Sequence, residues 1–263
     1  MPKPDLHQTR PRFGGAAYLV LVLTAGLVGC GGRVDTLTVS GAASLQNALA
    51  PIAAACQRRY PHIRIEVNFG GSGALAQQIA DGAPVDVFVS AAPQPMDRLE
   101  ARGLVLTGTR RNLLRNEIVL IAPLNSTVPR SFADLADTQI KLVADGDPAT
   151  VPAGDYARQV LTALNLWSRV QSKLVLGKDV RQVLGYIETG NADAGIVYAT
   201  DARQSGRVRV AAVAPADTHT PVVYPVAVLR GTRNPAAART FAAFLSGPEA
   251  RAIFTAQGFT VVP

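Results

Sequence analysis

The chain has 263 residues, of which 48% are hydrophobic and 17% are charged, and its formal net charge is +7. This length is sufficient for one large core or two medium-sized ones, and a chain with two cysteines is not a disulfide-stapled miniature domain. The cations are scattered or paired, without a basic stripe interleaved with aromatic residues, so we expect no nucleic-acid partner.

The N-terminus has the layout of a secretory leader. Residues 13–28 form an uncharged, mostly apolar run behind a basic segment, and this run is shorter than a typical membrane span. It ends in Leu27-Val28-Gly29-Cys30, which resembles a lipobox, where the cysteine is lipidated and becomes the first residue. We therefore predict a lipoprotein signal peptide over 1–29, lipidation of Cys30 and a tether over 30–35. The alternatives are an ordinary signal peptide with an incidental cysteine and an uncleaved anchor.

The sequence contains no cluster of His, Cys and carboxylate side chains at metal-ligand spacing. We therefore predict neither a metal site built from such ligands nor a bound cofactor. The second cysteine, Cys56, lies on the apolar face of the first predicted helix, a position that favours a buried, inert thiol over a nucleophile.

Three strand–helix units open the remaining chain. The predicted strands cover residues 36–40, 63–69 and 86–90, and a predicted helix follows each, beginning near 45, 74 and 93. Such a succession favours a parallel sheet of the α/β class. Pro51 falls inside the first helical pattern, where it removes one intrahelical hydrogen bond.

Two long apolar strands, over 117–123 and 222–229, mark the borders of a second α/β series. Within it we predict a short helix start at 131–135 and helices over 156–166 and 179–188. The predicted strands of this series cover 140–144, 174–176, 194–198 and 208–213. Two C-terminal helices, over 235–245 and 248–257, follow the second long strand. This order predicts an α/β protein of two lobes joined by two crossovers. Lobe 1 would comprise 36–117 plus 222–263, lobe 2 would comprise 118–221, and the last helices would pack on lobe 1.

Several turns between a strand and the next helix contain only small residues: Ala42-Ala43-Ser44, Gly70-Gly71-Ser72-Gly73 and Val151-Pro152-Ala153-Gly154. Helix N-termini have free N–H groups and a partial positive charge, and open α/β sheets bind ligands at this end of their strands. Small residues let a ligand approach that backbone closely. We therefore interpret Ser44 both as a helix N-cap and as a direct ligand of a bound anion.

The glycine-rich turn also permits two other interpretations. Residues 71–76 match G-x-G-x-x-A after a strand, a possible dinucleotide fingerprint, but this is not the first strand–helix turn of the chain. Residues 70–74 nearly match G-x-S-x-G, which would make Ser72 the nucleophile of a hydrolase. Asp193 or Asp201 and then His219 would complete the order Ser, Asp, His.

Six collinear segments resemble the molybdate-binding proteins of molybdate ABC importers, within the type II periplasmic solute-binding proteins. They are GAASLQNAL (41–49), ADGAPVDVFVSA (80–91), NEIVLIAP (116–123), GDPATVPAG (146–154), AGIVYATD (194–201) and VYPVA (223–227). The resemblance runs from about residue 37 to the C-terminus. It implies a two-lobed fold with hinge strands and an anion in the cleft, and the two long apolar strands would be the hinges.

The same resemblance implies a set of oxyanion ligands without charged side chains: Ser44, Ser72, Ala153, Val180 and Tyr198. The serines would offer hydroxyl and N–H groups, Ala153 and Val180 their backbone N–H, and Tyr198 its phenol. The turn around Ser72 contains Gly71 and Gly73, whereas the version usual in the family is rich in serine. These two glycines therefore remove possible hydroxyl donors.

The resemblance also implies a function. We expect an exported, monomeric receptor, periplasmic or extracytoplasmic and tethered as a lipoprotein, that is not an enzyme. It would capture molybdate, and tungstate as well, and deliver it to a membrane-embedded permease with a cytoplasmic ATPase. Molybdenum would enter only as the bound oxyanion. A receptor for sulfate or phosphate is the alternative of the same class, and the Ser72 hydrolase is the alternative of another class.

Overall fold

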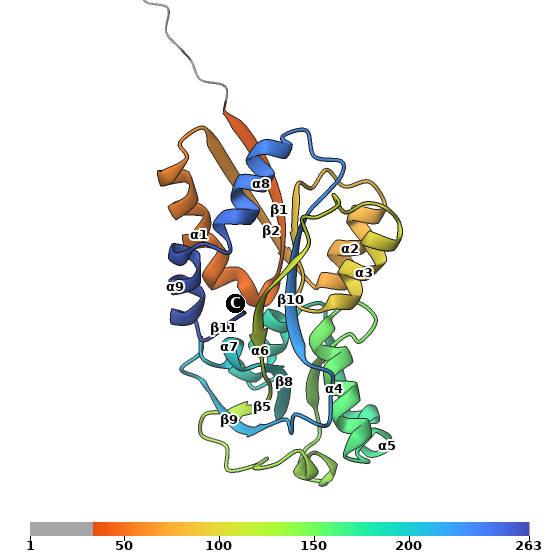
Figure 1. Ribbon diagram of the computed structural model, residues 1–263. Helices are drawn as coiled ribbons and strands as arrows, with labels where there is room; N and C mark the ends of the chain where they lie inside the picture. Colours follow the sequence, from red (N-terminus) through yellow and green to blue (C-terminus); the bar gives the residue numbers. More distant parts are fainter. Residues whose placement is uncertain (1–33, 263) are drawn as a thin grey trace, which may run out of the picture. The chain divides into compact units, whose positions relative to one another are not determined.

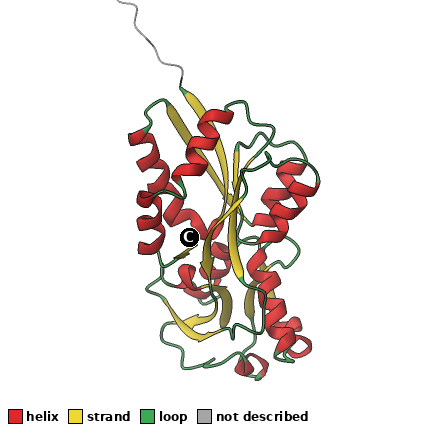
Figure 2. Ribbon diagram, in the orientation of Figure 1, coloured by secondary structure: helices red, strands yellow, loops and turns green. Residues whose placement is uncertain are grey.

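The computed structural model describes residues 34–262, and its strands form two sheets (Figures 1 and 2). The predicted signal peptide, the lipidation site Cys30 and most of the predicted tether lie outside the described residues. Asp35, the last residue assigned to the tether, already belongs to the first strand, where its N–H donates to the carbonyl of His62 at 2.8 Å. No helix among residues 34–262 has the length and hydrophobicity that a membrane span requires.

The first sheet has six strands in the order β11-β4-β10-β3-β1-β2. Their bounds are β1 Asp35–Ala42, β2 Ile63–Gly70, β3 Val87–Val89, β4 Arg111–Asn116, β10 Val222–Val228 and β11 Thr260–Val261. Strand β1 pairs in parallel with β2 and β3, whereas β10 is antiparallel to both β3 and β4. The predicted parallel units are therefore present, but the sheet as a whole is mixed.

Helices cover both faces of this sheet, as Figure 1 shows. Their bounds are η1 Ala43–Leu45, α1 Gln46–Arg59, α2 Ser72–Ala80, α3 Pro93–Ala101, α8 Pro235–Phe244 and α9 Pro248–Ala256. The C-terminal helices return to the first sheet as predicted, because α9 packs on α1 and β11 pairs with β4. We call this sheet and its helices lobe 1.

The second sheet has five strands in the order β7-β6-β8-β5-β9. Its strands are β5 Ile118–Pro123, β6 Val143–Gly146, β7 Leu174–Gly177, β8 Ala194–Tyr198 and β9 Val208–Val213. Its helices are η2 Ala133–Ala136, α4 Pro152–Ala163, α5 Trp167–Val170, η3 Gln171–Lys173, α6 Val180–Glu188 and α7 Ala199–Ala202. We call this sheet and its helices lobe 2.

The chain passes between the two sheets twice, as predicted. Strand β4 ends at Asn116 in lobe 1 and β5 begins at Ile118 in lobe 2, so a single residue, Glu117, separates them. The second passage is the segment between β9 and β10. The α/β class and the two crossovers are confirmed, while the residue-level limits of the lobes stay a prediction.

Six elements of the described residues were not predicted: the strands β4 and β11 and the short helices η1, α5, η3 and α7. The other elements match the prediction in type and order, with ends displaced by a few residues. Helix α1 continues through Pro51, and Cys56 is buried on its inner face.

Candidate functional site

A small cavity lies between the lobes at the carboxyl ends of several strands. Its walls come from lobe 1 (Ala42, Ala43, Ser44, Gly70, Gly71, Ser72, Ala91) and from lobe 2 (Val151, Pro152, Asp179, Val180, Tyr198). Its volume of about 10 Å³ is close to what one water-sized particle needs. This size excludes a bulky organic solute in this closed arrangement.

Four of the five predicted ligands line this cavity: Ser44, Ser72, Val180 and Tyr198. The fifth, Ala153, is fully buried in the first turn of α4, directly after the cavity-lining Pro152. The fold therefore brings the predicted set together from both lobes, across 154 residues of sequence between Ser44 and Tyr198.

Three of these residues lie in the first turns of helices, where backbone N–H groups have no intrahelical acceptor. Ser72 begins α2, Val180 begins α6, and Ala153 is the second residue of α4. Their N–H groups make no hydrogen bond to other residues within 34–262. On α6 the side chain of Asp179 takes the next two donors, because its Oδ1 accepts from the N–H of Arg181 and Gln182 at 2.9 Å each. The Val180 N–H is left for a ligand.

Ala91 holds two of the predicted hydroxyl ligands. Its N–H donates to Oγ of Ser72 at 2.9 Å, so the serine oxygen accepts from the backbone and keeps its own hydrogen for another acceptor. The phenol of Tyr198, across the lobe boundary, donates to the carbonyl of Ala91 at 3.4 Å. Burial raises the pKa of Tyr198 well above its ordinary value, so this phenol is a protonated donor at neutral pH.

The predicted N-cap role of Ser44 is wrong. Strand β1 continues through Ala42, where it pairs with Gly70 of β2, and a short 3₁₀ helix then leads into α1. Leu45 precedes α1, and no side chain caps either helix. Because β1 continues two residues beyond the predicted strand, Ser44 does not cap a helix, and its hydroxyl lies 3.0 Å from the hydroxyl of Tyr224.

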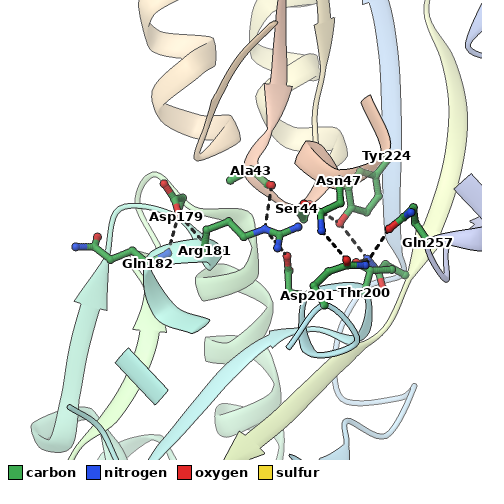
Figure 3. A network of polar contacts seen from close by, with 12 residues as sticks. Ala43, Ser44, Asn47, Asp179, Arg181, Gln182, Thr200, Asp201, Tyr224 and Gln257 are labelled. Atoms are coloured by element: carbon green, nitrogen blue, oxygen red, sulfur yellow. Dashed lines mark hydrogen bonds and ion pairs between the residues drawn. The ribbon is translucent and has the colours of Figure 1, made fainter. Parts of the chain in front are cut away.

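The two lobes touch around the cavity through polar contacts (Figure 3). The N–H of Gly73 in lobe 1 donates to the carbonyl of Thr150 in lobe 2 at 2.9 Å. Nε of Arg181 donates to the carbonyl of Ala43 at 3.4 Å, and the side-chain amide of Asn47 donates to that of Gln204 at 2.5 Å. These contacts define a closed cleft.

Charged side chains are sparse at the cavity wall. Among its lining residues Asp179 alone carries a charged side chain, and one of its oxygens caps α6. Within residues 34–262, no group of three or more His, Cys, Asp and Glu side chains is arranged to hold a metal ion. The donor set therefore suits an anion bound by hydrogen bonds, since N–H and O–H groups from several elements meet at one place.

The residues proposed for a hydrolase do not assemble. The ring of His219 packs against Tyr156, with ring centroids 5.8 Å apart, and its Nδ1 lies 2.7 Å from the carbonyl of the next residue. The carboxylate of Asp193 accepts from the backbone N–H groups of residues 141 and 142, and that of Asp201 pairs with Arg181. None of these groups contacts Ser72 within the part of the chain that the structure describes, so the serine has no activating base among them.

Two supporting side chains, Tyr224 and Arg181, were not predicted as part of the site. Both lie in segments that the sequence did mark, Tyr224 in the VYPVA block and Arg181 beside Val180. Nothing local reveals their contacts, because Tyr224 meets Ser44 across 180 residues and Arg181 meets Ala43 across 138 residues.

The chain is similar to known solute-binding proteins. The family described as "Bacterial extracellular solute-binding protein" matches residues 37–260. A putative ABC transporter substrate-binding lipoprotein of Bacillus subtilis is 43% identical over 251 residues, which cover 93% of this chain and 96% of the relative. The molybdate-binding protein ModA of Haemophilus influenzae is 41% identical over 230 residues, which cover 85% of this chain and 89% of that protein.

The fold is similar to a solved structure of the same kind. The periplasmic molybdate-binding protein of Azotobacter vinelandii superposes with a TM-score of 0.77 at 28% identity, over 86% of this chain and 99% of that one. The type II periplasmic-binding fold predicted from the sequence is thereby confirmed.

Proposed function

We infer that this chain, which belongs to the bacterial extracellular solute-binding protein family, captures molybdate between its lobes and delivers it to an ABC permease. One observation carries the inference. Unpaired N–H groups at the starts of α2 and α6 and hydroxyl groups from both lobes meet at one small cavity between the lobes, and the first turn of α4 adjoins it. The relatives named as molybdate-binding proteins support the choice of oxyanion.

We propose Ser44, Ser72, Ala153, Val180 and Tyr198 as the ligands. A buried dianion loses its hydration, which is very costly unless donors replace the lost water. Each helix start contributes roughly 0.3–1 kcal/mol, and up to about 2 kcal/mol where it is partly buried, in addition to the hydrogen bonds themselves. Neutral donors also leave no strong ion pair to break when the anion is passed on.

Binding by both lobes links capture to closure. Ser44 and Ser72 belong to lobe 1 and the other three proposed ligands to lobe 2, so an anion held by all five favours the closed form. A receptor that closes on its ligand presents a distinct surface to the permease, and this is the signal that delivery requires.

The remaining assignments are part of the same proposal. The protein is an extracytoplasmic monomer that performs no catalysis and holds no cofactor. Its membrane contact is a lipid on Cys30, in line with the lipoprotein named among its relatives. Tungstate binds as well, because its charge and size are close to those of molybdate, whereas sulfate and phosphate receptors are the alternatives.

Calorimetric titration of the purified protein with molybdate, tungstate, sulfate and phosphate tests the proposal. We expect molybdate and tungstate to bind with similar affinity and both to bind more tightly than sulfate and phosphate. Ser72→Ala should weaken molybdate binding by about 1–3 kcal/mol, because an oxyanion oxygen loses its donor. Tighter binding of sulfate than of molybdate would make this a sulfate receptor, and no binding of any of these anions would reject the oxyanion site.

A further inference from the structure

Two buried hydroxyl groups meet beside the proposed anion site. Oγ of Ser44 and Oη of Tyr224 are 3.0 Å apart, and both residues are almost completely inaccessible to solvent, at 3% and 0%. The distance alone does not say which of them donates. That direction decides whether the hydrogen of Ser44 is free for a ligand, because a serine hydroxyl has one hydrogen to give.

Asn116 sets the direction. Its Oδ1 accepts from the N–H of Glu117 at 2.9 Å, so the other end of the side-chain amide, Nδ2, faces the interior. The two hydrogens of Nδ2 then have two acceptors, Oγ1 of Thr200 at 2.8 Å and Oη of Tyr224 at 3.2 Å. An amide turned the other way would leave the Glu117 N–H facing a second donor, so this orientation is the one that satisfies every group.

The hydrogen of Tyr224 therefore goes to Ser44. The phenol oxygen already accepts from Asn116, and a fully buried O–H needs an acceptor. Among the described residues, the oxygen of Ser44 is the acceptor within reach. Burial raises the pKa of Tyr224 well above its ordinary value, so the phenol keeps its proton at neutral pH.

We propose that Tyr224, oriented by Asn116, is a positioning residue that commits the Ser44 hydroxyl to donate into the cleft. The proposal rests on the proposed function, since it takes Ser44 as a ligand of the bound oxyanion. The chain of donors runs from Asn116 to Tyr224 to Ser44 to the anion, and Figure 3 shows the Ser44 and Tyr224 hydroxyl groups facing each other. Each O–H in the chain accepts one hydrogen bond before it donates the next, which strengthens the last one.

This series of hydrogen bonds also joins the proposed anion site to the hinge. Asn116 is the last residue of β4, directly before the passage to lobe 2, and its second hydrogen bond reaches Thr200 in α7 of lobe 2. The amide that orients Tyr224 is thus held between the hinge segment and lobe 2.

A double-mutant cycle on molybdate affinity tests the proposal. Tyr224→Phe should raise the dissociation constant about fivefold, and Ser44→Ala should raise it by about tenfold or more. In the Ser44→Ala background, Tyr224→Phe should have no further effect, because its role acts through that hydroxyl. Tyr156→Phe is the matched control: it removes one hydrogen bond of another buried tyrosine, the bond to the carbonyl of Pro221, and should leave affinity unchanged.

Asn116→Asp provides a second, independent variant. A carboxylate accepts from Tyr224 instead of donating to it, so the phenol turns and then accepts the hydrogen of Ser44. Asn116→Asp should therefore lower molybdate affinity more than Tyr224→Phe does. In the Ser44→Ala background Asn116→Asp should cost less affinity, because only the repulsion between its added negative charge and the anion remains.

The outcomes separate this inference from the proposed function. Wild-type protein that binds none of the four oxyanions overturns both. If the wild type binds molybdate, two results overturn the positioning role alone. One is unchanged affinity in Tyr224→Phe. The other is a loss of affinity from Tyr224→Phe that is equally large with and without the Ser44 hydroxyl. Melting curves of every variant identify any loss that reflects unfolding.

Discussion

Nε of Arg181 lies 3.2 Å from Oδ1 of Asp201, and the same nitrogen donates to the carbonyl of Ala43 in the opposite lobe. Arg181 follows Val180 in α6, Asp201 lies three residues after Tyr198, and Ala43 precedes Ser44. One side chain thus links its own segment, which contains Val180, to two others that contain proposed ligands (Figure 3). Asp201 is fully buried and pairs with Arg181, so the cation is held in place beside the cleft.

We expect Arg181→Met to weaken molybdate binding about fivefold to tenfold, because closure loses a contact between the lobes. The substitution also leaves the buried Asp201 carboxylate without its ion pair, which destabilises the fold. The double variant Arg181→Met/Asp201→Asn should recover the melting temperature but not the affinity. Arg169→Met, at an exposed site on α5, is the control. Recovery of both properties in the double variant would assign Arg181 a purely structural role.

A second buried carboxylate, Asp145 on β6, predicts how stability depends on pH. Its Oδ1 accepts from the N–H of Gly146 at 2.8 Å, and its Oδ2 has no hydrogen-bond partner among residues 34–262. Burial raises the pKa of Asp145 well above its ordinary value in the folded protein. Between the unfolded and the folded pKa the native state binds more protons than the unfolded state, so stability falls as pH rises.

Asp145→Asn should therefore become progressively more stable than the wild type as pH rises from about 4, the pKa of an unfolded aspartate, toward 8. Urea unfolding at a series of pH values gives this difference directly, and we expect it to grow as pH rises. Asp147→Asn, a loop substitution two residues away, corrects for general charge effects. A difference that stays constant with pH would mean that Asp145 is ionised in the fold.

The thiol of Cys56 is predicted to be unreactive in the native protein. The side chain is fully buried, and burial, with a smaller contribution from Glu249, raises its pKa to about 11. At pH 8 the thiolate fraction is therefore about one in a thousand, and the sulfur is also inaccessible. A thiol reagent such as Ellman's reagent should modify it within minutes in urea but not in buffer. The Cys30→Ala variant ensures that Cys56 is the thiol observed.

The order of elements could be predicted from local patterns, but β4 could not. Its residues Arg111–Asn116 resemble a polar loop, because both ends are charged or polar and only Leu113 and Leu114 are buried. The strand forms because β10 pairs with it on one side and β11 on the other, across more than 100 residues of sequence. Pairing over that distance leaves no local periodicity.

The proposed site residues likewise divide into those with a local sequence signal and those without one. Ser72 and Ala153 lie in small-residue turns before helices, a pattern that local physics connects to anions. Val180 carries no such signal, and it entered the predicted set through the family resemblance alone. The failed cap at Ser44 has a long-range cause, since the backbone follows β2 for two residues more and the hydroxyl meets Tyr224 instead.

The two glycines at the Ser72 turn, first considered as lost hydroxyl donors, instead permit the lobes to approach. A Cβ on Gly73 would lie 2.7 Å from the carbonyl oxygen of Thr150 in lobe 2, and a Cβ on Gly71 would lie 2.9 Å from the same oxygen. Real Cβ atoms do not come this close to backbone oxygens, so either substitution forces the lobes apart.

Gly73→Ala should therefore weaken molybdate binding by about tenfold or more while the unliganded protein keeps its melting temperature, because the clash exists only in the closed form. Gly185→Ala is the matched control: a Cβ there meets no atom within 4 Å, and alanine in helix α6 should raise stability by about 0.5–1 kcal/mol without changing affinity. Titration calorimetry and melting curves measure both effects. Wild-type affinity in Gly73→Ala would mean that the anion binds without this approach of Gly73 to Thr150, and the cleft would then close on its ligand less tightly than the structure shows.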